Sequence, residues 1–189
     1  MFIQTEETPN PETLKFIPGK ELLAEGTLEY KNKKEASSFK LAKGFFDSGH
    51  VTNVFVGKDF ITITKSSEVD WEVLKPSILS VMLEFFAAGG KINEKDLKQK
   101  GKNIKYNYSK KDLDIVNKIK DLIDERIKPA VAQDGGDINF VKLEKGIVFL
   151  ELRGACSGCP SSAITLKSGI ENMLKYYIPE IKAVEAVNA

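Results

Sequence analysis

The chain has 189 residues, enough for one or two domains and too few for several. Its 42% hydrophobic and 29% charged residues are ordinary values for a soluble globular protein. Lys and Arg number 28 against 27 Asp and Glu, so no charge excess points to nucleic acid or an anionic membrane as a partner. No apolar run approaches the roughly 18 residues of a membrane span.

The first half of the chain predicts a small α+β unit. Short strands are expected at residues 13–17 and 27–30, and a helix is expected around residues 39–46, where aromatic residues recur at helical spacing before Gly49. Two β-branched and aromatic runs, 51–55 and 60–64, predict a hairpin. The apolar stripe over residues 71–86 predicts a helix whose regular part starts near Pro76.

A polar, Lys-rich stretch follows Gly89 and Gly90 and predicts a solvated linker rather than a nucleic-acid patch. We therefore expect a first domain at residues 1–88, a flexible linker at 89–109 and a second domain at 110–189.

The second half predicts another α+β unit. Ser109 and Asp112 match a capping box, and the helix they open carries an apolar face before Pro129 ends or kinks it. That face consists of Leu113, Val116, Ile119, Leu122, Ile123 and Ile127. A turn at 134–137, a hairpin of 138–143 with 147–152, a helix over 161–178 and a strand at 181–187 complete the unit. The expected fold class is α+β, with two small sandwich-like domains, each a mixed or antiparallel sheet with helices on one face.

Both cysteines of the chain lie in one motif, Gly154-Ala155-Cys156-Ser157-Gly158-Cys159-Pro160. The spacing Cys-x-x-Cys lets both sulfurs face one ion, and Pro160 suits the first position of the following helix. Backbone N–H groups and the helix dipole are then expected to lower the thiol pKa values and to favour the thiolates that bind metal.

This motif alone supplies too few ligands for a complete metal centre. A tetrahedral zinc ion or a cubane cluster normally needs four protein ligands, and this chain supplies two thiols. Its single histidine, His50, lies in the other unit and is expected to be a surface or turn residue. The simplest completion is a second copy of the chain, so that two protomers share one metal centre at a two-fold interface on surface loops.

Two other uses of the pair remain open. Dithiol–disulfide exchange also places Cys-x-x-Cys between a strand and a helix, but there the strand belongs to a βαβ unit, whereas here it comes from a hairpin. A structural zinc ion would likewise need dimerisation or further ligands. No Ser-His-Asp set, phosphate-binding loop or carboxylate pair stands out, so no catalytic residues and no enzymatic activity are expected.

The motif 154–162, preceded by Asp134-Gly135-Gly136-Asp137, resembles the C-terminal domain of NifU-like (Nfu) proteins. The first half is similar to the N-terminal Nfu domain over residues 8–16, 54–62 and 71–76, in the order of the family. The resemblance also suggests that the turn 134–137 packs near the Cys loop without supplying a ligand.

The resemblance implies an iron–sulfur cluster scaffold or carrier. It would hold a labile 4Fe–4S cluster, or a 2Fe–2S cluster, between two protomers through Cys156 and Cys159. It would transfer the cluster to client apoproteins after receiving it from an upstream assembly scaffold. The start of the chain has neither a signal-peptide nor a transit-peptide pattern, so we expect a bacterial cytoplasmic protein or a processed protein of the mitochondrial matrix.

Overall fold

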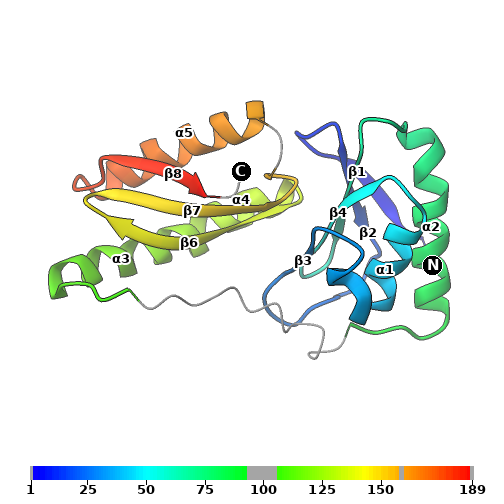
Figure 1. Cartoon of the computed structure of the whole chain (residues 1–189). Coiled ribbons are helices and arrows are strands. Elements are labelled where there is room, and N and C mark those ends of the chain that lie inside the picture. Colours follow the sequence, from blue (N-terminus) through cyan, green and yellow to red (C-terminus); the bar gives the residue numbers. More distant parts are fainter. Residues whose placement is uncertain (1, 93–105, 158–159, 188–189) are drawn as a thin grey trace. The chain divides into compact units, whose positions relative to one another are not determined.

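The computed structural model describes residues 2–92, 106–157 and 160–187, without the side chains of 160–163. The chain forms two compact units, Met1–Gly101 and Lys102–Ala189. Each combines one sheet with helices (Figure 1), so the expected α+β class is confirmed. The flexible linker expected at 89–109 falls largely on residues 93–105, outside the described part. No helix within the described ranges is long and apolar enough to cross a membrane.

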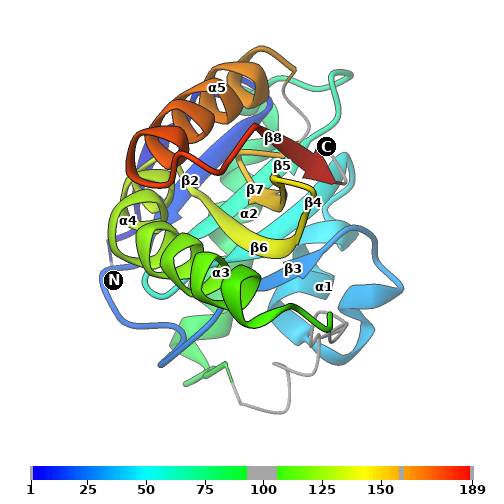
Figure 2. The same ribbon diagram turned by 90° about the vertical axis from the view of Figure 1, so that its left-hand side faces the viewer.

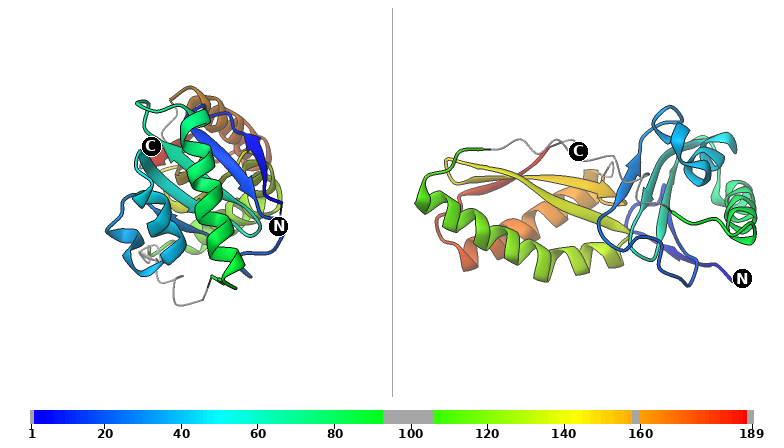
Figure 3. Two further views of the ribbon diagram at one scale, coloured as in Figure 1. Left: turned by 90° about the vertical axis from the view of Figure 1, so that its right-hand side faces the viewer. Right: turned by 90° about the horizontal axis from the view of Figure 1, so that it is seen from below.

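The first unit is a five-stranded antiparallel sheet whose strand order is β1-β2-β5-β4-β3. Helices α1 and α2 cover one face of it, as Figure 3 shows from the side of α2. The elements are β1 Gln4–Glu7, β2 Thr13–Ile17, β3 Leu28–Tyr30, a 3₁₀ turn Glu35–Ser38, α1 Lys40–Asp47, β4 Val51–Val56, β5 Ile61–Lys65 and α2 Trp71–Ala87.

Helix α2 begins at Trp71, five residues before the start expected from Pro76. The proline therefore lies inside the helix, where it removes a single backbone hydrogen bond. Leu74, Ile78 and Met82 of α2 pack into the core, and this burial compensates for the missing bond.

The second unit is a three-stranded mixed sheet with the order β6-β7-β8. Its helices lie on one face of the sheet (Figure 2). The elements are α3 Lys110–Leu122, a π-helical turn Ile123–Ile127, α4 Lys128–Gln133, β6 Gly136–Glu144, β7 Ile147–Gly154, α5 Pro160–Tyr177 and β8 Ala183–Val187.

Two sequence expectations about the first helix of this unit need correction. Of the two effects predicted for Pro129, an end or a kink, the end is wrong, because the chain passes through the π-helical turn into α4 and Pro129 lies in the first turn of α4. Leu113 is 47% exposed, whereas Ile115 is buried. Two positions correspond to about 200° around a helix, so the two residues point in opposite directions.

The pairing of the last strand was not anticipated. Strand β8 lies parallel to β7, with Val148 opposite Val184, so β7, α5 and β8 form a βαβ unit. Strand β7 is therefore the second strand of the β6–β7 hairpin and also the first strand of the βαβ unit. The argument that the Cys loop does not follow a βαβ strand is therefore wrong.

Strand β6 is an edge strand, and Tyr108 fixes its irregular end. The register of the β6–β7 pair shifts between Phe140 and Lys142, and next to this bulge the N–H of Leu143 donates to the Tyr108 hydroxyl at 3.0 Å. An aromatic side chain that precedes α3 thus accepts from a backbone donor on the open edge of the sheet.

We predict that Tyr108→Phe destabilises the second unit by about 1 kcal/mol, because the Leu143 N–H loses its acceptor while the ring stays in place. Thermal unfolding followed by circular dichroism should show a lower midpoint. Tyr106→Phe is the matched control, because it removes the hydroxyl of a neighbouring tyrosine whose ring contacts Tyr108 and leaves the acceptor of the Leu143 N–H in place. Equal midpoints for Tyr108→Phe and the unmodified chain would contradict this role.

Candidate functional site

The Cys loop begins where β7 ends. Gly154, the last residue of β7, has a φ of +61°, a conformation that glycine adopts without strain. The N–H of Ser157 donates to the Gly154 carbonyl at 3.1 Å, and the Ser157 hydroxyl donates to the same oxygen at 2.9 Å. The chain therefore reverses within four residues and places Cys156 at the tip of a tight turn.

The turn 134–137 packs directly against this loop. The Ala155 N–H donates to the Gly135 carbonyl at 3.2 Å, and Gly136 faces Gly154 across the β6–β7 pair. A Cβ atom at residue 136 would overlap the Cys156 Sγ atom and would lie 2.8 Å from the Arg153 carbonyl oxygen. The contact suggested by the family resemblance is thus present, and glycine at 136 leaves the space that the sulfur occupies.

Cys156 is a core residue in this structure. It is 7% exposed and belongs to the hydrophobic cluster that includes Ile138, Leu152 and Ile170. The sequence had placed both cysteines on a surface loop outside the core, and for Cys156 that expectation is wrong. The reason is that Gly136 has no side chain, so the Cys156 side chain can point into the space beside its backbone.

Burial, and after it the nearby carboxylates of Asp134 and Asp137, raise the pKa of the Cys156 thiol to about 12. A lowered thiol pKa was expected from the following helix, and for Cys156 this is also wrong. Desolvation of a thiolate inside an apolar cluster outweighs the dipole of a helix that begins four residues later. The neutral thiol is therefore the stable form at neutral pH.

Cys159 lies outside the described residues, so its assignment as the second ligand stays a prediction. Helix α5 begins at Pro160, as the sequence predicts. Among the residues that the structure describes, no three His, Cys, Asp or Glu side chains gather in a group that could hold a metal ion.

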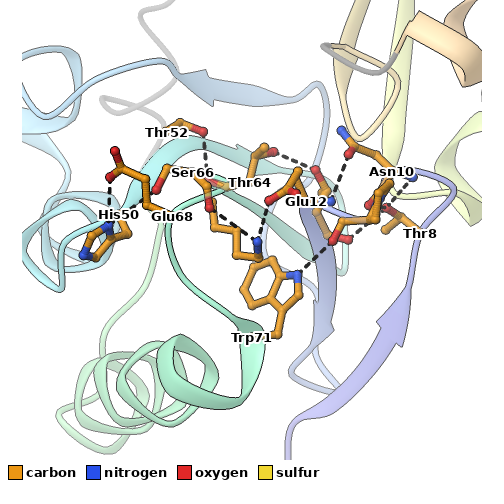
Figure 4. Close-up of polar contacts among 12 residues, drawn as sticks. Thr8, Asn10, Glu12, His50, Thr52, Thr64, Ser66, Glu68 and Trp71 are labelled. Carbon is orange, nitrogen blue, oxygen red and sulfur yellow. Dashed lines mark hydrogen bonds and ion pairs between the residues drawn. The ribbon is translucent and has the colours of Figure 1, made fainter.

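His50 lies in the first unit, partly exposed, with Nδ1 3.7 Å from the Glu68 Oε2 atom and 3.4 Å from the Ser66 hydroxyl (Figure 4). It has a φ of +60° and follows Gly49, which agrees with the turn position that the sequence predicts. These neighbours are a carboxylate and a hydroxyl on the surface of the first unit, as the sequence predicts for a surface or turn histidine.

The first unit carries a second feature that sequence reasoning missed. A groove of about 550 Å³ runs between the edge strand β1 and the start of α2, with Glu7, Pro9, Trp71 and Glu72 among its lining residues. The Trp71 indole N–H donates to the Pro11 carbonyl at 3.1 Å, which fixes one wall (Figure 4). The sequence marked 8–11 only as an extended segment, because a groove depends on which helix lies beside it.

The two halves of the chain match two family models. The N-terminal domain of the scaffold protein Nfu/NifU matches residues 3–89, and the NifU-like domain matches residues 119–185. NifU-like protein 5, mitochondrial, of Arabidopsis thaliana is 46% identical over 187 residues, which cover 98% of this chain and 67% of that protein. The chain belongs to the Nfu family. The resemblance seen in the sequence is confirmed.

Other Nfu relatives show the same extent of similarity. A Drosophila sechellia protein named NFU1 iron-sulfur cluster scaffold homolog, mitochondrial, is 46% identical over 99% of this chain and 65% of its own length. The chain therefore spans about two thirds of these relatives.

Among solved structures, a NifU-like protein from Saccharomyces cerevisiae is 32% identical, with a TM-score of 0.44, covering 47% of this chain and 81% of that one. A Staphylococcus aureus protein is 24% identical with a TM-score of 0.40, covering 43% of this chain and 99% of that one.

We predict that Gly136→Ala displaces the Cys loop, because the new methyl group needs the space of the Cys156 sulfur. Overpacking of this kind costs about 1–3 kcal/mol, and iron retention after anaerobic reconstitution should fall as well. Thermal unfolding and iron content per chain measure the two effects.

The matched control is Gly169→Ala in α5, where a Cβ would meet nothing within 4 Å. That variant should keep its iron and be no less stable, since alanine favours helix more than glycine does. Unchanged stability and iron content in Gly136→Ala would show that the Cys156 sulfur is not packed closely against residue 136.

The raised pKa predicts a slow reaction of Cys156 with iodoacetamide, since only the thiolate reacts. In the Cys159→Ser variant, we expect alkylation at pH 8 to be at least about a hundredfold slower in the folded than in the urea-unfolded chain. The rate should climb as pH rises toward 12, where the thiolate forms. Mass spectrometry gives the rates, and folded and unfolded rates within threefold of each other would contradict a buried, neutral thiol.

Proposed function

We propose that this chain is an iron–sulfur cluster carrier. It holds a labile 4Fe–4S cluster between two copies through Cys156 and Cys159 and passes the cluster to client apoproteins. The cluster is its cargo rather than a resident cofactor, and the chain itself catalyses no turnover.

The observation that carries this proposal is the Cys loop itself. Only two thiols are present in the chain, both in one Cys-x-x-Cys motif, and the sulfur of Cys156 lies against the backbone of Gly136. An iron–sulfur cluster prefers thiolate ligands and needs about four protein ligands. Two copies supply that number. The family relationship, in which relatives are named iron–sulfur cluster scaffolds, supports the same role.

The buried state of Cys156 bears on how firmly such a cargo is held. Binding requires the thiol to lose its proton and to leave the apolar cluster that encloses it. Both steps cost free energy, which subtracts from the strength of the iron–sulfur bonds. Such a site binds a cluster less tightly, which suits a protein that later releases it.

The first unit is proposed to recognise clients or the upstream scaffold. Its core is complete, and its groove beside Trp71 has walls held by hydrogen bonds: Thr8 donates to the Thr13 carbonyl at 2.9 Å, and Glu12 N–H donates to the Asn10 side chain at 3.0 Å. A preformed groove binds a partner with little ordering cost. The mitochondrial names of the Drosophila and Arabidopsis relatives favour the matrix over the bacterial cytoplasm as its compartment.

Dithiol–disulfide exchange is the second candidate, and the βαβ arrangement of β7, α5 and β8 favours it. The neutral state of Cys156 opposes it, because exchange needs a reactive thiolate and efficient sites have pKa values near or below about 7. A zinc ion shared by two copies is the third candidate and uses the same ligands.

Anaerobic reconstitution of the full chain with iron and sulfide distinguishes the three. The carrier predicts about four iron and four sulfide per two chains, a brown absorbance, and a dimer that dissociates when the cluster is removed. A dithiol reductase predicts that the colourless monomer reduces insulin disulfides, and a zinc site predicts tight zinc without iron retention.

Cys156→Ser and Cys159→Ser should each lose the cluster. Because Cys156 is buried, circular dichroism of each apo variant must first show a folded chain. A folded variant that retained a normal iron content would refute the ligand assignment.

A further inference from the structure

The exposed face of α5 lacks charge. Over residues 164–177 the exposed residues are Ile164, Thr165, Ser168, Gly169, Asn172, Tyr176 and Tyr177. Two of them are large and strongly exposed, Ile164 at 65% and Tyr176 at 80%. The side of a surface helix that faces water normally carries charged residues.

The charged residues of this part of α5 are all paired and partly buried. Lys167 binds Glu185 of β8 at 2.8 Å, and Lys175 binds Glu171 one turn away. Glu171 also accepts the Val184 N–H at 3.0 Å. The charges therefore join the helix to its own sheet and leave the outer face neutral.

Helix α3 of the same unit shows the ordinary pattern. Its exposed residues are mostly charged: Lys110, Lys111, Asp112, Asp114, Lys118, Lys120 and Asp121. The contrast between the two helices means that the composition of the chain does not explain the neutral face of α5. That face is suited to contact with another protein surface.

We propose that the end of this face nearest the Cys loop, centred on Ile164, packs against the same surface of a second copy when the two copies share a cluster. The inference rests on the proposed function. A two-fold pair that brings both Cys loops to one centre must also bring together the starts of both α5 helices, because Pro160 directly follows Cys159. Ile164 lies one turn, about 6 Å, along the helix from Pro160.

The size of the surface explains why the cluster would still be needed. Helix α5 has 18 residues, so its outer face is about 27 Å long and about 10 Å wide. Even two whole faces would bury only on the order of 500 Å², and the end at Ile164 buries less, whereas stable dimers bury about 1,200 Å² or more. The contact therefore adds to the iron–sulfur bonds and cannot hold the pair alone. Neutral surfaces also avoid the repulsion that two identical charged faces would create.

The test compares Ile164→Asn with Tyr176→Asn in the full chain, reconstituted without oxygen. Tyr176 lies on the same exposed face but about 24 Å from Pro160, beyond the reach of the contact. Dilution with light scattering gives the dimer dissociation constant, and chemical analysis gives iron and sulfide per chain. We expect Ile164→Asn to raise the dissociation constant at least about tenfold, because an apolar side chain is lost from both copies. Tyr176→Asn should stay within about twofold of the unmodified chain.

Ile164→Val separates the apolar contact from a general defect, and it should restore most of the affinity. Unchanged apo thermal midpoints establish that the variants fold. If the unmodified chain dimerises with its cluster and Ile164→Asn does so equally well, the contact surface is wrong while the carrier function stands. An equal loss of dimer affinity in Ile164→Asn and Tyr176→Asn would also refute a contact centred on Ile164. If the unmodified chain takes up no cluster, the proposed function fails and the inference fails with it.

Discussion

The contact of the Cys156 sulfur with Gly136 is the constraint on which the candidate site depends. Strand pairing places Gly136 opposite Gly154, and the bond from Ala155 to Gly135 closes the loop over the turn. Two stretches of backbone meet here without side chains between them, and the thiol fills the space. The position of the Cys156 thiol is therefore set by a sheet and by a turn more than fifteen residues upstream, rather than by the local loop alone.

The same contact links stability to chemistry. A side chain that helps to complete an apolar cluster contributes to folding when neutral, and it must give up that contribution to bind metal. Loading of a cluster, if the proposed function holds, therefore lowers the stability of the second unit. In the proposed carrier this makes release less costly than it would be from a site whose ligands already point outward, and the second unit regains its packed core when it is empty.

Much of the fold was predictable because its signals are local. The hairpin of β4 and β5, the capping box at Ser109 and the helix start at Pro160 each depend on a few neighbouring residues, and each is found where the sequence placed it. Strand β1 was missed because Gln4–Glu7 is polar and becomes a strand only by pairing with β2, and the parallel pairing of β8 likewise depends on residues far away in the chain. Residue spacing identified the cysteine pair. The burial of Cys156 was not predictable, because it depends on the absence of a side chain at Gly136, in another element.

The bulged edge of β6 also limits the ways in which copies of this chain can associate. A straight, open edge invites strands of other molecules to extend the sheet, and repeated addition of that kind leads to fibres. Here the register shift near Phe140, the Lys142 side chain over the Phe149 ring and the Tyr108 hydroxyl on the Leu143 N–H interrupt the row of free backbone groups. Extension of the sheet through the β6 edge is therefore disfavoured.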